Sequence, residues 1–225
     1  MRLKKQRIKN KMKIELVKYS GDDLMIVNSA RVSLGKEKTE IDKSDIKLIK
    51  YLIDNNHSST LEHCFFTFRL QIPIYVARQL MRHRSWSFNE ISGRYVEFTD
   101  SFFTPDKFRL QDKDIKQGSK EDDENILNQD DIKNKYNQIL DNAYQGYQEL
   151  LKLGVCKEQA RGVLPLSLNT ELYATCNLRS LFHYLQLRLH KHAQKEIQEL
   201  SQDMLKLVKN IDGNPFKYSL ESFGL

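Results

Sequence analysis

The 225-residue sequence contains few cysteines and no long apolar run. Its three cysteines, Cys64, Cys156 and Cys176, are odd in number and far apart, which argues against a disulfide framework and favours a reducing cytoplasm. No apolar stretch approaches the roughly 20 residues that a helix needs to cross a bilayer. None with a cleavage site follows the basic start, so we expect a soluble protein without a signal peptide or membrane span.

Several common nucleotide- and metal-binding motifs are also absent. The sequence has no Gly-x-Gly-x-x-Gly turn and no Gly-x-x-x-x-Gly-Lys loop, so it predicts neither a Rossmann cofactor site nor a P-loop. Zinc-type ligands occur at His63-Cys64 and His190-x-His192, but without the paired spacing that closed tetrahedral sites favour. Nothing around any serine resembles a nucleophile elbow. We therefore predict no metal site and no hydrolytic triad.

Positive charge is concentrated at the start of the chain. The formal net charge is +6, and residues 1–13 contain seven basic side chains without one acid: Arg2, Lys4, Lys5, Arg7, Lys9, Lys11 and Lys13. Blocks of like charge repel and chain ends fray, so we expect a solvated extension followed by a nearly neutral domain from residue 14 to 225. Contact with RNA or steering of anionic ligands is the alternative role for this extension.

Hydrophobic periodicity and helix breakers predict a protein of mixed structure. Strands are expected at 14–17 and at 63–72, where Pro73 closes the second strand. Helices are expected at 22–30, 42–55, 74–82, 130–153 and 178–209, with a break at 163–165. The charged stretch around 111–131 is expected to be a surface insertion. The expected fold is α+β, a single domain in which a small, mainly antiparallel sheet packs with long helices.

The most informative segment runs from Arg82 to Tyr95. Its sequence, RHRSWSFNEISGRY, carries three arginines, a histidine and one carboxylate among hydroxyl groups and a single glycine. An unpaired guanidinium removed from water costs roughly several kcal/mol, so this group of cations needs an anionic partner. Guanidinium groups match phosphate oxygens two at a time, and Ser92-Gly93 adds a hydroxyl and a backbone that can approach an oxygen closely. The segment therefore predicts a binding loop for a phosphorylated substrate.

Written as R-H-R-x-x-S-x-N-x-x-S-x-R-Y, this segment resembles the flavin-dependent thymidylate synthases at every fixed position. The resemblance covers roughly residues 13 to 210 and includes short segments at 30–33, 57–63, 77–79, 160–161, 164–166, 177–180, 187–188 and 192–194. It implies an enzyme that makes thymidylate (dTMP) from deoxyuridylate (dUMP), with FAD as cofactor and methylenetetrahydrofolate and NADPH as co-substrates. It also implies a homotetramer in which FAD lies across subunit interfaces and each active site draws residues from several chains.

The resemblance also assigns roles to individual residues. By resemblance, the dUMP-binding residues are Gln79, Arg82, Glu90, Ile91, Ser92, Gly93, Arg94, Arg161 and Arg188. The FAD-binding residues are Ser33, His57, Ser59, Arg82, His83, Arg84, Glu90, Asn177, Arg179 and His183, although an asparagine is expected where His183 stands. Arg188 is the catalytic residue, because in the family the arginine at this position lies against the uracil ring and helps to ionise it.

Two of these assignments depend on predicted helices. Gln79 and Arg82 are three residues apart on the helix expected at 74–82, so they should share a face. Arg188 and His192 are four residues apart on the helix expected at 178–209 and should also face the same side. Taken alone, each pair is equally typical of polar residues on a solvated helix surface.

Two alternative functions remain open from the sequence. The basic extension and the arginine-rich loop are compatible with a nucleic-acid-binding protein, which would bind oligonucleotides with a steep salt dependence and show no flavin spectrum. A flavin-binding protein that has lost methyl transfer would oxidise NADPH but make no thymidylate. Every fixed position of the pattern at 82–95 is present, so nothing in the sequence supports such a loss.

Overall fold

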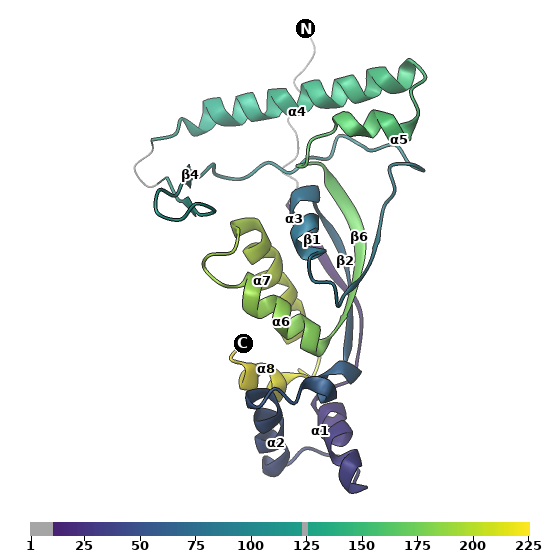
Figure 1. Ribbon diagram of the computed structural model, residues 1–225, viewed down its shortest axis with the longest axis vertical. Helices are drawn as coiled ribbons and strands as arrows, with labels where there is room; N and C mark the ends of the chain where they lie inside the picture. The colour runs from purple at the N-terminus through teal and green to yellow at the C-terminus, as the bar shows by residue number, and fades with distance from the viewer. Residues whose placement is uncertain (1–10, 123–125) are drawn as a thin grey trace. The chain divides into compact units, whose positions relative to one another are not determined.

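The structure is a computed structural model that describes residues 11–122 and 126–225 (Figure 1). Most of the basic extension predicted at 1–13 lies outside the described residues, as do residues 123–125 of the predicted insertion. By its contacts the chain forms two compact units. The α4 unit contains Gln71–Gln79 and Glu90–Leu172, and the α6 unit contains Ile14–Leu70, Leu80–Asn89 and Tyr173–Leu225. Because each unit combines stretches separated in sequence, the chain is not two domains in succession.

Four strands form one sheet in the order β1-β2-β6-β3. Their bounds are Lys13–Ser20 for β1, Phe65–Pro73 for β2, Ser87–Glu90 for β3 and Asn169–Asn177 for β6. Strands β2 and β6 run antiparallel, because Leu178 N–H donates to Cys64 O at one end and Ile74 N–H donates to Leu168 O at the other, both at 2.9 Å. The predicted mixed α and β class with a small antiparallel sheet is therefore confirmed.

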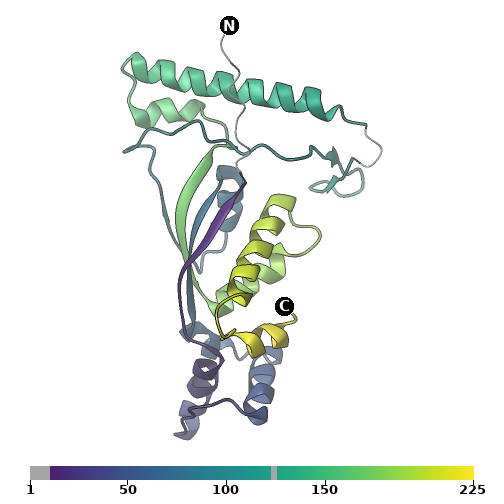
Figure 2. The ribbon, with the colours of Figure 1, turned by 180° about the vertical axis from the view of Figure 1, so that it is seen from behind.

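The core of the α6 unit lies between the sheet and two helices. Every second side chain of β2 is completely buried, as expected for a strand with one face against a core: Phe66, Phe68 and Leu70 belong to this unit, and Ile72 belongs to the α4 unit. Helices α6 (Leu178–Arg188) and α7 (Lys195–Lys209) lie along one face of the sheet (Figure 2). They bury Leu181 and Leu185 of α6 and Leu200 and Met204 of α7 at helical spacing.

A second group of helices in the α6 unit confirms the predicted helix starts. Helix α1 (Asp23–Arg31) begins after Asp22, whose carboxylate accepts from Met25 N–H at 2.7 Å. Helix α2 (Lys43–Asp54) begins after Asp42, which forms a capping box with Asp45. These helices lie side by side, and the short helix α8 (Lys217–Phe223) packs against both (Figure 1).

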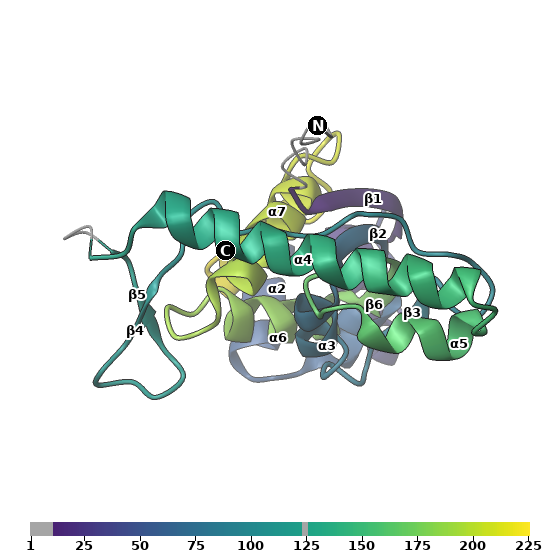
Figure 3. The ribbon, with the colours of Figure 1, turned by 90° about the horizontal axis from the view of Figure 1, so that it is seen from above.

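The α4 unit is built around one long helix. Helix α4 (Gln129–Lys152) confirms the predicted helix at 130–153 and lies beside the short helix α5 (Lys157–Ala160) (Figure 3). Its buried Leu140 packs in a cluster with Phe102 and Leu168. The predicted insertion contains a two-stranded antiparallel ribbon, β4 (Leu110–Gln111) and β5 (Ser119–Lys120), near the N-terminal end of α4.

Helix α3 (Ile74–Leu80) is shorter than predicted. It ends at Leu80, so Arg82 lies in the following turn and does not share a helix face with Gln79; that expectation is wrong. The turn forms as His83 N–H donates to Leu80 O at 3.0 Å, and Trp86 is buried against the ring of Tyr184. Burial of His83 and Trp86 outweighs local helix preference, which is a weak determinant of structure.

The helix predicted at 178–209 is in fact two helices. Helix α6 ends at Arg188 and α7 begins at Lys195, so the expectation that Arg188 and His192 share a helix face is also wrong. The reversal lets the apolar sides of both helices enter one core. No glycine or proline marks it in the sequence. Strand β6, which pairs with β2, was not predicted either.

Candidate active site

The α6 unit contains a pocket of about 580 Å³ where the end of α2 meets the start of α6. Three of the predicted flavin-binding residues line it: Asn177, Arg179 and His183. The opposite wall includes Leu52 of α2 and Glu62 of the 3-10 helix η2 (Ser58–His63). Asn177 is the N-cap of α6 and accepts from Ser180 N–H at 2.9 Å, which fixes the helix start at the pocket.

The main cation of this pocket is paired within the unit. Arg179 donates to the carboxylate of Glu62, and both side chains are substantially exposed. An exposed ion pair of this kind contributes only about 0–1 kcal/mol, so an anionic ligand can compete for the guanidinium. The N-terminus of α6 adds a positive partial charge at the same place. The pocket therefore favours an anion such as a pyrophosphate.

A second pocket of about 510 Å³ lies next to the first, and the two share Leu52, Asn56, Ser58 and Arg179. The predicted flavin-binding residues His57 and Ser59 line this second pocket. Both are exposed. The α6 unit thus brings five of the predicted flavin-binding residues to two adjoining pockets, and Arg179 belongs to both.

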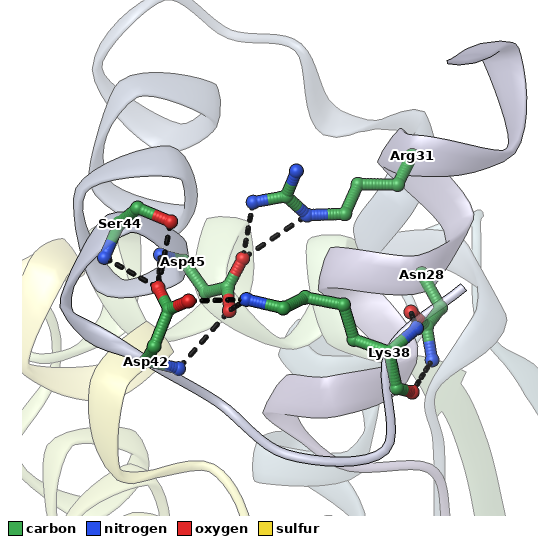
Figure 4. A network of polar contacts seen from close by, with 6 residues as sticks. All are labelled: Asn28, Arg31, Lys38, Asp42, Ser44 and Asp45. Atoms are coloured by element: carbon green, nitrogen blue, oxygen red, sulfur yellow. Dashed lines mark hydrogen bonds and ion pairs between the residues drawn. The ribbon is translucent and has the colours of Figure 1, made fainter. Parts of the chain in front are cut away.

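Ser33 lies apart from the lining of both pockets, on the exposed 3-10 helix η1 (Val32–Leu34). The connection that carries it is held by a polar network (Figure 4). The side chain of Asn28 bonds both backbone groups of Lys38, accepting from N–H and donating to C=O at 2.9 Å each. Lys38 in turn reaches the carboxylates of Asp42 and Asp45. The network thus ties the connecting segment to the end of α1 and to the start of α2.

Asp45 is the centre of this network. Its side chain is fully buried, and it accepts from Arg31 and from Lys38 Nζ, the latter at 2.5 Å. Burial acts to raise the pKa of Asp45, but hydrogen bonds from Lys38, the Asp42 backbone and Arg31 outweigh it and hold that pKa below its usual value. Hydrogen bonds to the carboxylates of Asp42 and Asp45 raise the pKa of Lys38. The network is therefore fully charged at neutral pH.

Arg188, the predicted catalytic residue, ends α6 in a half-buried position. Its Nε donates to Nε2 of His83 at 3.0 Å. Burial, together with the positive charges of Arg188 and His183, lowers the pKa of His83 to about 4. His83 is thus neutral at pH 7 and carries its proton on Nδ1. A neutral acceptor orients the guanidinium without cancelling its charge, which a carboxylate would do.

In the turn that contains His83, the two arginines Arg82 and Arg84 are exposed. Burial lowers the pKa of Arg188, and the charge of Arg82 lowers it further, so these two arginines lie near each other in one subunit. His83 itself is buried with its ring edge-to-face against Tyr184 at 5.0 Å. The turn therefore presents two solvated cations beside one buried imidazole.

The α4 unit contains most of the predicted dUMP-binding residues. Glu90 ends β3 and accepts from the hydroxyl of Thr170 on β6. Ile91 N–H continues this pairing by donating to Glu171 O at 2.9 Å. Beyond it the chain leaves the sheet, and Arg94 N–H donates to Ser92 Oγ at 3.3 Å. The segment is thus a tight loop anchored to β6 on one side.

Two of the predicted arginines meet at one glutamate. Arg94 Nε lies 2.8 Å from a carboxylate oxygen of Glu158 on α5. Arg161, at the start of the 3-10 helix η3 (Arg161–Val163), donates from Nε to the backbone oxygen of Glu158 at 3.3 Å. Gln79 lies half-buried near the end of α3 in the same unit. Arg94 and Arg161 therefore lie together at Glu158 and make a candidate anion-binding group.

Sequence reasoning missed Glu62 and Glu158, the two carboxylates that pair with predicted ligand-binding arginines. Glu62 belongs to the segment 57–63 that carries the family resemblance, so its place in the pattern was the available signal. Glu158 has no such signal, because only folding brings it to Arg94.

The cysteines contribute no activated thiol in the buried part of the structure. Burial raises the pKa of Cys64 to about 12 and raises the pKa of Cys176 strongly, so neither forms a thiolate readily. All three cysteines are free, and Cys156 is exposed. The described residues contain no group of three or more potential metal ligands. Within the same residues, no helix is both long and apolar enough to span a bilayer.

The two pockets of the α6 unit fit FAD by their donor set. Arg179 and the N-terminus of α6 suit phosphate oxygens, while Asn177, Ser58 and His183 offer hydrogen-bonding groups. Apolar side chains of Leu52, Leu61 and Phe182 complete the walls. Most of the residues that line the two pockets are polar, so the fit depends on hydrogen-bonding groups more than on apolar walls.

Comparisons with known proteins agree with the pattern at 82–95. A family model described as thymidylate synthase complementing protein matches residues 15–212. A flavin-dependent thymidylate synthase of Kosmotoga olearia is 44% identical over 197 residues, covering 88% of this chain and 85% of the relative. That of Thermus thermophilus is 43% identical over 196 residues, covering 87% of this chain and 71% of the relative.

A solved structure is also similar to this chain. The crystal structure of a UMP/dUMP methylase from Streptomyces cacaoi bound with 5-Br dUMP is 34% identical to this chain, with a TM-score of 0.86 and 96% of each chain covered. Together with the matches in sequence, this likeness means that the chain belongs to the family of flavin-dependent thymidylate synthases.

Proposed function

We propose that this protein is an FAD-dependent thymidylate synthase, which converts dUMP to dTMP by reductive methylation. Methylenetetrahydrofolate provides the one-carbon unit, NADPH is the reductant, and tetrahydrofolate is released. The observation that carries the proposal is the family match over residues 15–212, within which every fixed position of the pattern at 82–95 is present.

The flavin is proposed to bind at the two pockets of the α6 unit. Asn177, Arg179 and His183 would hold it from one pocket and His57 and Ser59 from the other. Further contacts are proposed for Ser33, Arg82, His83, Arg84 and Glu90. When bound, FAD supplies the redox chemistry, taking reducing equivalents from NADPH and giving the hydride that completes the methyl group.

The nucleotide is proposed to bind at the anion-binding group of the α4 unit. Arg94 and Arg161 would take the phosphate, since planar guanidiniums match its oxygens two at a time. Contacts to the remainder of dUMP are proposed for Gln79, Arg82, Glu90, Ile91, Ser92 and Gly93. The exposed ion pair between Arg94 and Glu158 must open when the phosphate binds.

Arg188 is proposed to activate the pyrimidine. Its guanidinium, oriented by neutral His83, would favour the anionic form of the uracil ring and so make carbon 5 nucleophilic. Carbon 5 would then bond to the methylene carbon of the folate while a carbon–nitrogen bond of the folate breaks. Carbon 5 would lose its proton before the hydride completes the methyl group, so no protein nucleophile is required. Buried thiols with raised pKa values at Cys64 and Cys176 agree with this assignment.

We further propose a homotetramer in which subunits share active sites. Exposed apolar side chains near the flavin pockets support this, because contiguous exposed apolar surface is typical of interfaces. Val32 and Leu34 flank Ser33 with 71% and 66% of their surface exposed. We also propose that the domain comprises residues 14–225, with a basic extension at 1–13 and a charged surface insertion around 111–131. The free cysteines support a proposed cytoplasmic location.

The decisive experiment is the absorbance spectrum of the purified protein combined with an assay of dTMP formation. We expect flavin absorbance bands and conversion of dUMP that requires methylenetetrahydrofolate and NADPH. A colourless protein that binds oligonucleotides with a steep salt dependence would support the nucleic-acid alternative instead. A yellow protein that oxidises NADPH without making dTMP would indicate loss of methyl transfer.

A further inference from the structure

Gly93 occupies a space that admits no side chain. It is buried, and a Cβ placed on it would lie 2.3 Å from Cε2 of Phe98 and 2.9 Å from Cδ of Arg161. Its backbone does not adopt the left-handed conformation that only glycine tolerates easily. The requirement for glycine is therefore steric, and it comes mainly from the Phe98 ring and to a smaller extent from the stem of Arg161.

Phe98 is fixed at both ends of its backbone by two tyrosines of α4. Its N–H donates to the hydroxyl oxygen of Tyr147 at 3.2 Å. Its C=O accepts from the hydroxyl of Tyr144 at 3.4 Å. Its ring packs against the cluster formed by Phe102, Leu140 and Leu168. Tyr147 is completely buried, so this anchor belongs to the core of the α4 unit.

The anchored ring and the stem of Arg161 both lie close to Gly93, at the point where a Cβ would stand. Gly93 lies between Ser92 and Arg94 in the loop, and the Arg161 side chain passes over it at the level of Cδ. Arg161 and Arg94 both reach Glu158, one at its backbone oxygen and the other at its carboxylate. A shift of the ring would therefore move the stem of Arg161 and the loop that carries Arg94 together.

We propose that Phe98, held by Tyr144 and Tyr147, is a positioning residue for the nucleotide, and that Gly93 and Phe98 are a fitted pair that sets the spacing of Arg94 and Arg161. The inference rests on the proposed function, since it takes the phosphate of dUMP as the ligand of those arginines. It assigns no chemical step to Phe98 or to the tyrosines, which act through the arginines.

The test is a double-mutant cycle on Gly93→Ala and Phe98→Leu. Gly93→Ala overpacks the space between Gly93 and the Phe98 ring, and we expect dUMP to bind about tenfold or more weakly. Phe98→Leu shortens the ring that blocks the Cβ and should weaken binding by only a few-fold. In the double variant, the leucine makes room for the methyl group. Affinity should then return to about that of Phe98→Leu alone.

Tyr147→Phe and Tyr144→Phe test the hydrogen bonds that hold the Phe98 backbone, without changing the contact between Gly93 and the Phe98 ring. Each removes one hydroxyl that bonds the Phe98 backbone, and each should raise the KM for dUMP while kcat and FAD absorbance stay at the wild-type level. Ile139→Ala, on an exposed face of the same helix, is the control and should leave the KM for dUMP, kcat and FAD absorbance unchanged. These variants carry the test if Gly93→Ala proves too unstable to purify.

The results distinguish this proposal from the proposed function. If the wild-type protein makes no dTMP, the proposed function fails whatever the variants do. If the wild type is active but the two losses simply add in the double variant, Gly93 and Phe98 are independent and the fitted pair is refuted. A Tyr147→Phe variant that loses thermal stability with an unchanged KM for dUMP would reduce the anchor to a structural role.

Discussion

The neutral imidazole of His83 orients the guanidinium of Arg188, the proposed catalytic residue. His83 accepts from Arg188 and stays uncharged, so the full guanidinium charge of Arg188 remains available to the uracil ring that is proposed to bind there. We predict that Arg188→Ala lowers kcat for dTMP formation by about 10²–10³, the usual cost of losing one preorganised donor. Its flavin spectrum should remain that of wild type. A variant within tenfold of wild-type kcat would show that another group ionises the ring.

Glu158 offers a second test at the residue scale. Its carboxylate pairs with Arg94 where the phosphate is proposed to bind, and both side chains are more than half exposed. Glu158→Gln removes a competitor, so we predict that dUMP binds up to about fivefold more tightly, in line with the small worth of exposed ion pairs. Arg94→Lys keeps the charge but loses the planar fork and should bind more weakly. Isothermal titration calorimetry of both variants checks this, and weaker binding by Glu158→Gln would mean that Glu158 positions Arg94 for the ligand.

At the scale of elements, the network between α1 and α2 holds the connection that carries Ser33 (Figure 4). Asn28→Ala removes both side-chain bonds to the Lys38 backbone and should loosen this connection. We predict weaker FAD binding, by roughly fivefold to tenfold for two lost hydrogen bonds, measured by flavin fluorescence on titration. Lys50→Ala, which breaks the exposed pair with Asp54 on α2, is the control and should leave FAD affinity unchanged. If Asn28→Ala and Lys50→Ala bind FAD with equal affinity, the connection that carries Ser33 does not contribute to flavin binding.

How much of this arrangement could be predicted depends on how local its causes are. Asp22 and Asp42 cap α1 and α2 through contacts within four residues, and the sequence pattern predicted both helix starts. The end of α3 depends on burying Trp86 against Tyr184, nearly a hundred residues away. The residues proposed to bind ligands were predicted by resemblance alone. Glu158, which pairs with Arg94, and Tyr147, which accepts from Phe98 N–H, were not predicted, because those contacts exist only after α4 and α5 have folded.

At the scale of the whole molecule, shared active sites predict complementation between defective chains. Arg94→Ala and Arg188→Ala should each be nearly inactive alone. If one active site takes Arg94 and Arg188 from different subunits, dissociating and mixing the two chains equally should restore up to about one quarter of wild-type activity. The mixture should elute as a tetramer. Activity that stays at the level of the single variants, in a confirmed mixed tetramer, would place both arginines of a site on one subunit.

Two buried groups predict opposite pH effects on stability. Burial raises the pKa of Asp23 to about 6, although hydrogen bonds from Ser219 and Tyr218 act to lower it. The folded state therefore holds this proton more tightly than the unfolded state, and the stability gained is lost as pH rises through about 6. His83 behaves in the opposite way, because its folded pKa of about 4 lies below the unfolded value of 6.5. Its contribution is present above pH 6.5 and is lost as pH falls toward 4.

Between pH 4 and 6 these two contributions largely offset each other in the wild-type protein, and single substitutions should separate them. We predict that Asp23→Asn becomes progressively less stable than wild type as pH falls from about 6, because it lacks the proton that Asp23 gains on folding. His83→Gln should become progressively more stable relative to wild type over the same range. Each difference should change by at most about 1.4 kcal/mol per pH unit, the limit for one proton. Urea unfolding of the three proteins at several pH values measures both slopes. Slopes of the same sign would mean that at least one of these groups is not titrating as its burial requires.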